Sequence, residues 1–363
     1  MTTSVTSATE KSGDSTPIVK PAQGYKRIAT EEAFATSEML KHYAKLLAKG
    51  GIDDPGFHSL WGFYLNSKAP RAMSVIERLQ DLGPRRIGDM DATGIDRQII
   101  SLTAPGVQIL DKATAVSLAR SANDELAEAV RNHPTRYTGL TAVAPQDPKS
   151  AAKEIERGVT KLGFKGVIVN SHTHGEYLDD PKFWEIFEAA EAHNVPVYLH
   201  PTSMSRAMVT PFLARGLDGA IYGFGAETGL HMLRIIVSGV FDRFPRLQMM
   251  IGHLGEALPF WLFRIDYMHR ATVAAKRYES VKPLRRKPSD YLRENVYVTT
   301  SGMADEAAIT YCQKVLGMDR VLYAMDYPYQ FVAEEVLTSD NLPLSAADKK
   351  KFFQTNAEKA FSL

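Results

Sequence analysis

Side chains that bind metal ions or transfer protons stand at the ends of four apolar runs in this chain. They are Glu31 in 27–34, His200 at the end of 195–200, His253 after 247–252 and Asp326 after 321–325. If the runs are parallel strands of a barrel, their C-terminal ends meet at one mouth, where such barrels carry out chemistry. We therefore expect the four side chains to converge.

Glu31, His200 and Asp326 together form a candidate ligand set for a divalent metal ion. Two carboxylates and one imidazole favour Mn²⁺ or Mg²⁺, with Zn²⁺ as an alternative because it binds the same groups. Taken singly, a glutamate at a strand end is usually solvated, and a histidine before proline usually packs in the core. Their joint placement at the ends of separate strands favours the metal site. A structural zinc site built from several cysteines is excluded, because Cys312 is the single cysteine.

A second candidate metal site is the pair His172 and His174, which follows the run at 166–170. On an extended segment, residues two apart face the same side, and this is a common arrangement of metal ligands. We expect His172 to reach the mouth and His174 to lie in the next loop. The pair therefore ranks below Glu31, His200 and Asp326.

His253 is a candidate proton donor or acceptor, and Glu256 lies one helical turn further on, where it can orient the ring. The alternative is a histidine that caps a helix beside a solvated glutamate. Arg264 follows two turns later. It is either a fork for a carboxylate or an ordinary surface arginine, and its place in the sequence favours the surface.

The elements that must position these residues alternate between strand and helix. Apolar runs rich in Val, Ile and Leu predict strands buried on both faces, as in parallel sheets, at 27–34, 98–103, 138–143, 166–170, 195–200, 247–252, 296–300 and 321–325. Helical periodicity occurs at 113–132, 149–162, 181–193, 303–316 and 346–361. The alternation predicts a (β/α)8 TIM barrel that forms a single domain over 25–363. A doubly wound sheet is the alternative, but the Gly-rich loop expected after its first strand is missing.

Two connections are long, 35–97 after the first strand and 204–246 after the fifth. The first contains the aromatic residues Trp61, Phe63 and Tyr64. Such an insertion either roofs the mouth of the barrel or serves loop packing or an oligomer contact. The spacing alone does not separate these alternatives.

The composition is typical of a globular enzyme, with 363 residues, 44% of them hydrophobic, and a net charge of +1. This charge gives no support for nucleic acid or an anionic membrane as a partner. No run approaches the roughly 18 apolar residues of a membrane helix. Residues 1–24 are predicted to be a disordered tail, not a secretory signal. One cysteine fits a reducing, cytoplasmic location.

With these residues identified, the chain resembles the amidohydrolase-related, metal-dependent decarboxylases. The resemblance rests on the segments 27–35, 59–64, 89–96, 143–148, 252–256, 324–330 and 351–358. It covers nearly the whole chain after the predicted tail. It implies an enzyme that uses Mn²⁺, needs no organic cofactor and forms a homodimer or homotetramer.

The resemblance also assigns roles to individual residues. It implies that Glu31, His200 and Asp326 bind the metal and that His253 is the active-site histidine. It implies substrate contacts from Arg71, Arg264 and Tyr329, with Arg264 entering the pocket of a neighbouring subunit, in contrast to the surface position favoured above. The wider superfamily has a second ligand on the first strand, where this chain has Ala33. The missing ligand leaves room on the metal for water and substrate.

The reaction implied by the resemblance is non-oxidative decarboxylation of an ortho-hydroxybenzoate, most specifically of 5-carboxyvanillate to vanillate and CO2 in lignin-derived aromatic catabolism. The carbon that loses CO2 must first be protonated. Asp326 is the predicted acid, assisted by His253 and Glu256. Alternatives are a γ-resorcylate or 2,3-dihydroxybenzoate type of substrate, and a metal-dependent hydrolase of an ester, lactone or amide. A non-catalytic metal-binding barrel is the third alternative.

Overall fold

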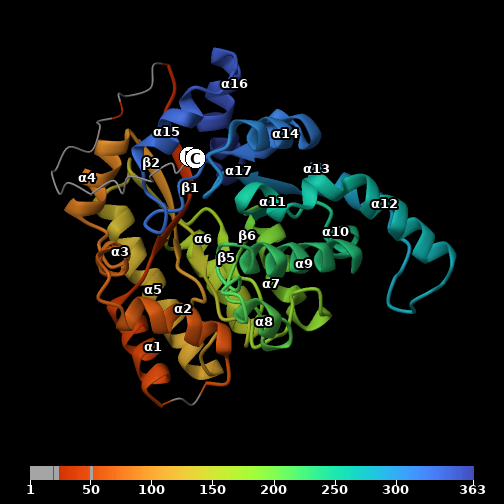
Figure 1. Ribbon diagram of the computed structural model, residues 1–363, viewed down its shortest axis with the longest axis horizontal. Coiled ribbons are helices and arrows are strands. Elements are labelled where there is room, and N and C mark those ends of the chain that lie inside the picture. The colour runs from red at the N-terminus through yellow and green to blue at the C-terminus, as the bar shows by residue number, and fades with distance from the viewer. Residues whose placement is uncertain (1–18, 20–23, 50–51) are drawn as a thin grey trace, which may run out of the picture.

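The computed structural model describes residue 19, residues 24–49 and residues 52–363 (Figure 1). The tail predicted at 1–24 lies outside the described residues except for Val19 and Gly24. Parallel strands occupy the centre of the molecule in two hydrogen-bonded sheets, ordered β1-β2-β3 and β4 to β9. The strands are β1 Ile28–Phe34, β2 Arg97–Leu102, β3 Tyr137–Gly139, β4 Thr141–Ala142, β5 Val167–Asn170, β6 Val197–His200, β7 Met249–Ile251, β8 Val296–Thr299 and β9 Val321–Leu322.

Backbone hydrogen bonds join the two sheets into one ring. The N–H of Leu140, between β3 and β4, donates to the carbonyl of Ile100 in β2 at 2.9 Å. The N–H of Thr30 in β1 donates to the carbonyl of Tyr323, directly after β9, at 3.1 Å. These contacts, together with the alternation of strand and helix, confirm the predicted (β/α)8 barrel. The strand predicted at 138–143 is interrupted at Leu140, because the chain changes its partner there from β2 to β5.

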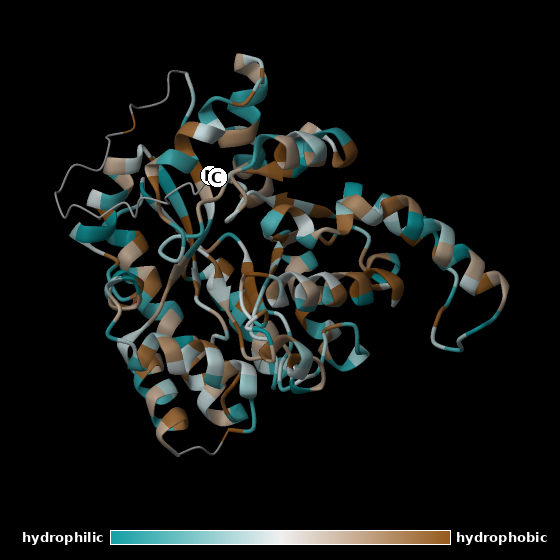
Figure 2. Cartoon of the chain, viewed as in Figure 1, coloured by the Kyte–Doolittle hydropathy of each residue, from teal (hydrophilic) through white to brown (hydrophobic). Residues whose placement is uncertain are grey.

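Helices surround the strands, and hydrophilic and hydrophobic residues alternate along them (Figure 2). The 35–97 insertion contains α1 Ser37–Lys49, α2 Pro55–Asn66, α3 Pro70–Leu79 and α4 Pro84–Thr93. The next helices are α5 Lys112–Asn132, α6 Pro148–Thr160, η1 Pro181–Phe183, α7 Trp184–Ala192, α8 Arg206–Leu213, α9 Gly223–Val237 and α10 Val240–Arg243. The last are α11 His253–Glu256, α12 Leu258–Ala274, α13 Pro288–Glu294, α14 Glu306–Leu316, η2 Met318–Arg320, α15 Ala333–Asp340, α16 Ala346–Lys350, η3 Lys351–Thr355 and α17 Asn356–Phe361.

The strands are buried on both faces, as the continuous apolar runs predict. Every residue of β1, β5, β7 and β8 is buried. The C-terminal helical segment docks on the barrel, where the ring of Phe353 lies 4.8 Å from that of Tyr323. Among the described residues, no helix combines the length and apolarity needed to cross a membrane.

Candidate metal centre and active site

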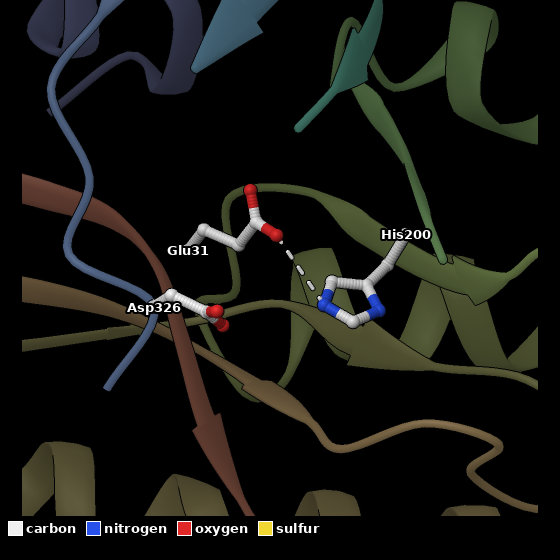
Figure 3. Close-up of side chains that lie close together, drawn as sticks. All are labelled: Glu31, His200 and Asp326. Atoms are coloured by element: carbon white, nitrogen blue, oxygen red, sulfur yellow. Dashed lines mark ion pairs between the residues drawn. The ribbon is translucent and has the colours of Figure 1, made fainter. Parts of the chain in front are cut away.

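Three predicted ligands from three strand ends converge in the mouth of the barrel. Glu31 lies in β1, His200 ends β6, and Asp326 follows β9. One ligand atom of each lies within 4.8 Å of those of the other two. Figure 3 shows both carboxylates turned toward the imidazole ring. Because parallel strands bring their C-terminal ends to one edge, residues 295 positions apart in sequence meet at one point.

Glu31 is buried, and its two carboxylate oxygens have different surroundings. Oε2 accepts hydrogen bonds from the Tyr198 hydroxyl and, at 2.7 Å, from Thr299 Oγ1. Oε1 accepts no hydrogen bond and lies 3.3 Å from His200 Nε2. Burial alone would raise the pKa of Glu31, but the neighbouring His253 and His200 hold it below its ordinary value. An ionised carboxylate is therefore present with one oxygen still to be satisfied.

His200 presents its outer nitrogen to that oxygen. Its Nδ1 lies 2.7 Å from the carbonyl oxygen of Pro201, to which it donates. In the neutral ring this leaves a lone pair on Nε2, directed at Glu31. Burial lowers the pKa of His200, but the neighbouring carboxylate of Glu31 outweighs burial and raises it. Glu31 Oε1 and His200 Nε2 can therefore share a cation that lies between them.

These donors fit a divalent metal ion. A buried carboxylate oxygen without a hydrogen-bond donor is costly, and coordination of a cation satisfies it. A metal-binding histidine usually donates its second ring N–H to a carbonyl or carboxylate, as His200 does to Pro201. With Asp326 the set offers two carboxylates and one imidazole. Glu31, His200 and Asp326 can thus hold Mn²⁺.

Asp326 differs from Glu31 in protonation. Burial, followed by the charge of Glu31, raises the pKa of Asp326 to about 7, although His253 and His200 act in the opposite direction. Its backbone is left-handed, with φ of 71°. Conformations of this kind cluster at functional sites, where the surrounding structure maintains them.

His253 and Glu256 lie next to the three ligands. His253 Nδ1 is 2.7 Å from Glu256 Oε1, and its Nε2 is 3.7 Å from Glu31 Oε1. Burial disfavours the charged ring, but Glu256 and Glu31 outweigh it and raise the pKa of His253 to about 10. The ring is therefore an imidazolium at neutral pH in the metal-free protein. The predicted orientation of His253 by Glu256 agrees with this contact.

A left-handed turn presents this pair. Every residue from 253 to 257 has φ between 50° and 82°, a conformation that costs about 1–2 kcal/mol per non-glycine residue. Two glycines of α9 allow the turn to approach. A Cβ at Gly225 would lie 3.0 Å from Glu256 Oε2, and one at Gly229 would lie 3.1 Å from the Glu256 carbonyl oxygen. Helix α12 begins at Leu258, directly after this turn.

A cavity of about 420 Å³ opens beside these side chains. His253, Glu256 and Asp326 line it together with Gly302, Gln330 and residues of α9. A Cβ at Gly302 would lie 3.6 Å from His253 Cδ2 and 3.8 Å from Asp326 Oδ2. The absence of a side chain at Gly302 leaves space next to the two groups that can transfer protons.

Two of the predicted substrate residues contact each other at the mouth. Arg71, exposed on α3, donates from Nη2 to the carbonyl oxygen of Tyr329 at 2.9 Å. The Tyr329 hydroxyl lies 2.6 Å from Thr103 Oγ1. The ring of Tyr64, from the aromatic insertion, lies 5.6 Å from that of Tyr329. The insertion therefore reaches the mouth through Tyr64, while Trp61 is fully buried in loop packing.

Arg264 does not join the site of its own chain. It is exposed on α12 and lines a neighbouring groove of about 510 Å³ with Met268, Tyr278 and Trp261, the last of which also lines the cavity beside Asp326. In a single chain Arg264 therefore lies at the surface, the position that its place in the sequence favours.

The histidine pair at 172 and 174 is also separate from the metal ligands. His172 Nε2 lies 3.0 Å from the carbonyl oxygen of Ser203, and His174 Nε2 lies 3.1 Å from that of Leu110. Both ring nitrogens of His172 are engaged, one by the carbonyl oxygen of Ser203 and the other by the N–H of Gly175, so His172 is not a candidate ligand in this arrangement.

Sequence reasoning did not single out three residues that support the ligands. Tyr198 and Thr299 hold Glu31 Oε2, and Glu32 contacts the backbone around Asp326. Tyr198 was detectable, because it lies two residues before His200 in a strand and so shares its face. No comparable signal marked Thr299 or Glu32.

Comparisons with known proteins give a consistent result. A family model described as Amidohydrolase matches residues 77–363. Gamma-resorcylate decarboxylase of Polaromonas sp. (strain JS666) is 37% identical over 350 residues, or 93% of this chain and 98% of that protein. The crystal structure of 5-carboxyvanillate decarboxylase from Novosphingobium aromaticivorans, with manganese and 4-hydroxy-3-methoxy-5-nitrobenzoic acid, is 56% identical at a TM-score of 0.92, over 94% and 97% of the two chains. That of 5-carboxyvanillate decarboxylase from Sphingomonas paucimobilis is 41% identical at 0.87, over 94% and 100%.

The barrel and its strand-end ligands define a metal-dependent α/β-barrel enzyme. The chain belongs to the amidohydrolase family. The three proteins named above are decarboxylases of aromatic carboxylates, and solved neighbours contain bound manganese. The predicted family, the predicted class of metal-dependent decarboxylase and the predicted metal are confirmed.

Proposed function

We propose that this enzyme decarboxylates 5-carboxyvanillate to vanillate and CO2, in the catabolism of lignin-derived aromatics. The observation that supports this proposal most directly is that Glu31, His200 and Asp326 converge beside His253 at the mouth of the barrel. The similarity to 5-carboxyvanillate decarboxylases, at 56% and 41% identity, favours this substrate over γ-resorcylate, whose decarboxylase is 37% identical.

Residues 25–363 act as one barrel domain, and the unpaired, buried Cys312 suits the cytoplasm.

The residues divide the chemistry between them. Bound Mn²⁺, held by Glu31, His200 and Asp326, supplies positive charge that neutralises and orients the anionic oxygens of the substrate. As a metal ligand Asp326 carries no proton, so it takes one from the charged ring of His253 and passes it to the ring carbon that carries the carboxylate. The bond between the ring and the carboxylate breaks, its electron pair restores the aromatic ring, and CO2 leaves. No electrons pass to an acceptor, so no organic cofactor is required.

His253 and Glu256 form the second catalytic pair. Glu256 keeps the imidazole oriented and charged, and His253 acts on the substrate or resupplies the proton that Asp326 gives up. Arg71 and Tyr329 bind the substrate from the α3 side of the mouth. Arg71 contributes a guanidinium fork for the second anionic group of a dicarboxylated phenol.

Arg264 completes the substrate site from a second copy of the chain, so the active unit is a homodimer or a tetramer built from such dimers. Helix α12 projects from the body of the molecule (Figure 1). Phe260 and Phe263 on this helix are 74% and 84% exposed, and Tyr267 is also exposed. Residues 260, 263, 264 and 267 share one helical face. An apolar face of this kind marks an interface, and it carries Arg264 with it.

The direct test is product analysis. Protein loaded with Mn²⁺ is incubated separately with 5-carboxyvanillate, γ-resorcylate and 2,3-dihydroxybenzoate, with Asp326→Asn as the inactive control. We expect vanillate and CO2, with the highest kcat/KM for 5-carboxyvanillate. Preference for another hydroxybenzoate would overturn the substrate and retain the reaction. In a parallel incubation with an ester, a lactone and an amide, products whose combined mass exceeds that of the substrate by one water would support the hydrolase alternative.

A further inference from the structure

We propose that Glu32 is a positioning residue that fixes Asp326 for metal binding and proton transfer. Glu32 follows Glu31 in β1, and the two carboxylates have different partners: Glu31 contacts side chains of β6 and β8, whereas Glu32 contacts the backbone on both sides of Asp326. The pairing of β1 with β2 shifts register between Ala29 and Glu32. Such bulges re-aim side chains near active sites. The inference rests on the metal site of the proposed function but not on the identity of the substrate.

Glu32 holds the backbone on both sides of Asp326. Its Oε1 accepts the Met325 N–H at 3.0 Å, and its Oε2 accepts the Tyr327 N–H at 3.1 Å. The Ala33 N–H donates to the carbonyl oxygen of Tyr327 at 2.7 Å. Glu32 and Ala33, which are adjacent in β1, therefore form hydrogen bonds with the backbone on both sides of Asp326.

Asp326 requires such support. β9 ends at Leu322, so the segment that carries Asp326 has no ladder of its own to define its path. The left-handed backbone of Asp326 is uncommon for a residue with a side chain, and it persists only where neighbouring groups maintain it. The two hydrogen bonds to the Glu32 carboxylate provide this constraint at the peptide groups on either side of Asp326.

Burial raises the pKa of Glu32 to about 8, although the N–H groups of Met325 and Tyr327 and the nearby Arg86 act in the opposite direction. Glu32 and Arg86 are both 0% exposed. Arg86 Nη2 donates to the carbonyl oxygen of Ala33 at 2.6 Å, and its guanidinium lies 4.5 Å from the centre of the Tyr327 ring. The Tyr327 hydroxyl donates to Asp89 at 2.9 Å. The segment containing Asp326 is thus anchored to β1 and α4 through side chains that never reach the cavity.

Glu32→Gln tests whether these two backbone hydrogen bonds fix the position of Asp326. A glutamine has one accepting oxygen, and its amide group would face a peptide N–H that cannot turn away. The matched control is Glu227→Gln, which is also 0% exposed. Glu227 accepts hydrogen bonds from two hydroxyls, Ser171 Oγ and the Tyr177 hydroxyl, each at 3.0 Å. Hydroxyls can reverse their direction and accommodate an amide.

The readouts are Mn²⁺ affinity by calorimetry, the electron paramagnetic resonance spectrum of bound Mn²⁺, and kcat and KM at saturating metal. For Glu32→Gln we expect Mn²⁺ affinity to fall by about tenfold or more, the range found for residues that orient metal ligands. We also expect an altered spectrum and a loss in kcat that exceeds the change in KM. Glu227→Gln should match the wild type in all three.

A folded Glu32→Gln variant with wild-type affinity and spectrum would overturn the proposal. If that variant does not fold, Glu32→Asp replaces it. Its carboxylate is one methylene too short to accept both N–H groups, and we expect the same losses, whereas wild-type values would overturn the proposal. Failure of the proposed function is distinguishable: wild-type protein would decarboxylate none of the substrates, while Mn²⁺ affinity would still depend on Glu32.

Discussion

Glu31 Oε1 and His200 Nε2 face each other at 3.3 Å inside the barrel, each with an electron pair directed at the other. His200 Nδ1 is already engaged by the Pro201 carbonyl oxygen, so Nε2 carries a proton only when the ring is charged. The two atoms can therefore share either a proton or a metal cation. Metal binding at this site is a competition with protons, and this has consequences for both stability and pH dependence.

Removal of the metal should abolish activity and lower stability. Without Mn²⁺, the buried Oε1 of Glu31 loses the cation that satisfies it. Free Mn²⁺ at about 1,000 times its Kd should stabilise the fold by about 4 kcal/mol. Thermal unfolding and turnover, measured after chelation and again after Mn²⁺ is restored, check this. Glu31→Gln is the control and should show no stabilisation by Mn²⁺; equal melting temperatures for wild type with and without the metal would refute the site.

Mn²⁺ affinity should rise with pH through neutrality. Burial and then Glu31 raise the pKa of Asp326 to about 7, and the pKa of His200 is raised by Glu31 against the effect of burial. Both groups must lose their protons to bind metal. Below pH 7 each proton that Mn²⁺ displaces should weaken binding by about tenfold per pH unit, whereas affinity should level off above the pKa values.

Calorimetric titrations between pH 6 and 8, in buffers of different ionisation enthalpy, would measure the affinity and the protons released. Asp326→Asn should bind more weakly and release fewer protons. Constant affinity across this range, without proton release, would contradict the assignment of Asp326 as a ligand.

The convergence of the three candidate metal ligands was predictable, because each lies on or shortly after a strand of one parallel barrel. Glu31, His200 and Asp326 needed only the topology of a parallel barrel to bring them together. The left-handed turn at 253–257 was not predictable in the same way. Among its residues only Gly255 favours that conformation, and the turn depends on glycines of α9 that are distant in sequence.

Glu32 and Arg264 show two further limits of sequence reasoning. Glu32 is adjacent to a predicted metal ligand and carries the same carboxylate group. Only the fold shows that Glu32 accepts hydrogen bonds from the backbone of Met325 and Tyr327, and not a metal ion. Arg264 lies on an exposed helix, and the periodicity of one chain contains no information about a second copy. Residues that act through backbone contacts or across an interface require the structure.

Glu256→Gln should remove the negative charge of Glu256 but keep the hydrogen bond that orients His253. Glutamine can still accept the hydrogen bond from His253 Nδ1, but the negative charge that helps raise the pKa of His253 to about 10, against the effect of burial, is lost. We expect that pKa to fall and kcat/KM to drop by about 10–100-fold. Mn²⁺ affinity should change little, because Glu256 is not a ligand.

The pKa of His253 can be followed by nuclear magnetic resonance in the metal-free protein, alongside kcat/KM. Glu279→Gln is the control, because Glu279 is exposed beyond the end of α12. An unchanged kcat/KM in Glu256→Gln would exclude the charge of Glu256 from the mechanism.

Arg264→Ala should be inactive alone and active in mixed dimers with Asp326→Asn. In a mixed dimer, the chain with intact Asp326 receives Arg264 from its partner and forms one complete site. The other site lacks both groups. Random exchange makes half of the dimers mixed, with one active site of two, so we expect about a quarter of wild-type turnover.

The measurement is turnover before and after the two inactive variants are unfolded together and refolded, with each variant refolded alone as the control. Phe263→Glu, which introduces a charge on the exposed face of α12, should prevent dimer formation and the recovery of activity together. No recovery in verified mixed dimers would show that Arg264 does not act across the interface. Full activity of Arg264→Ala alone would remove it from the substrate site.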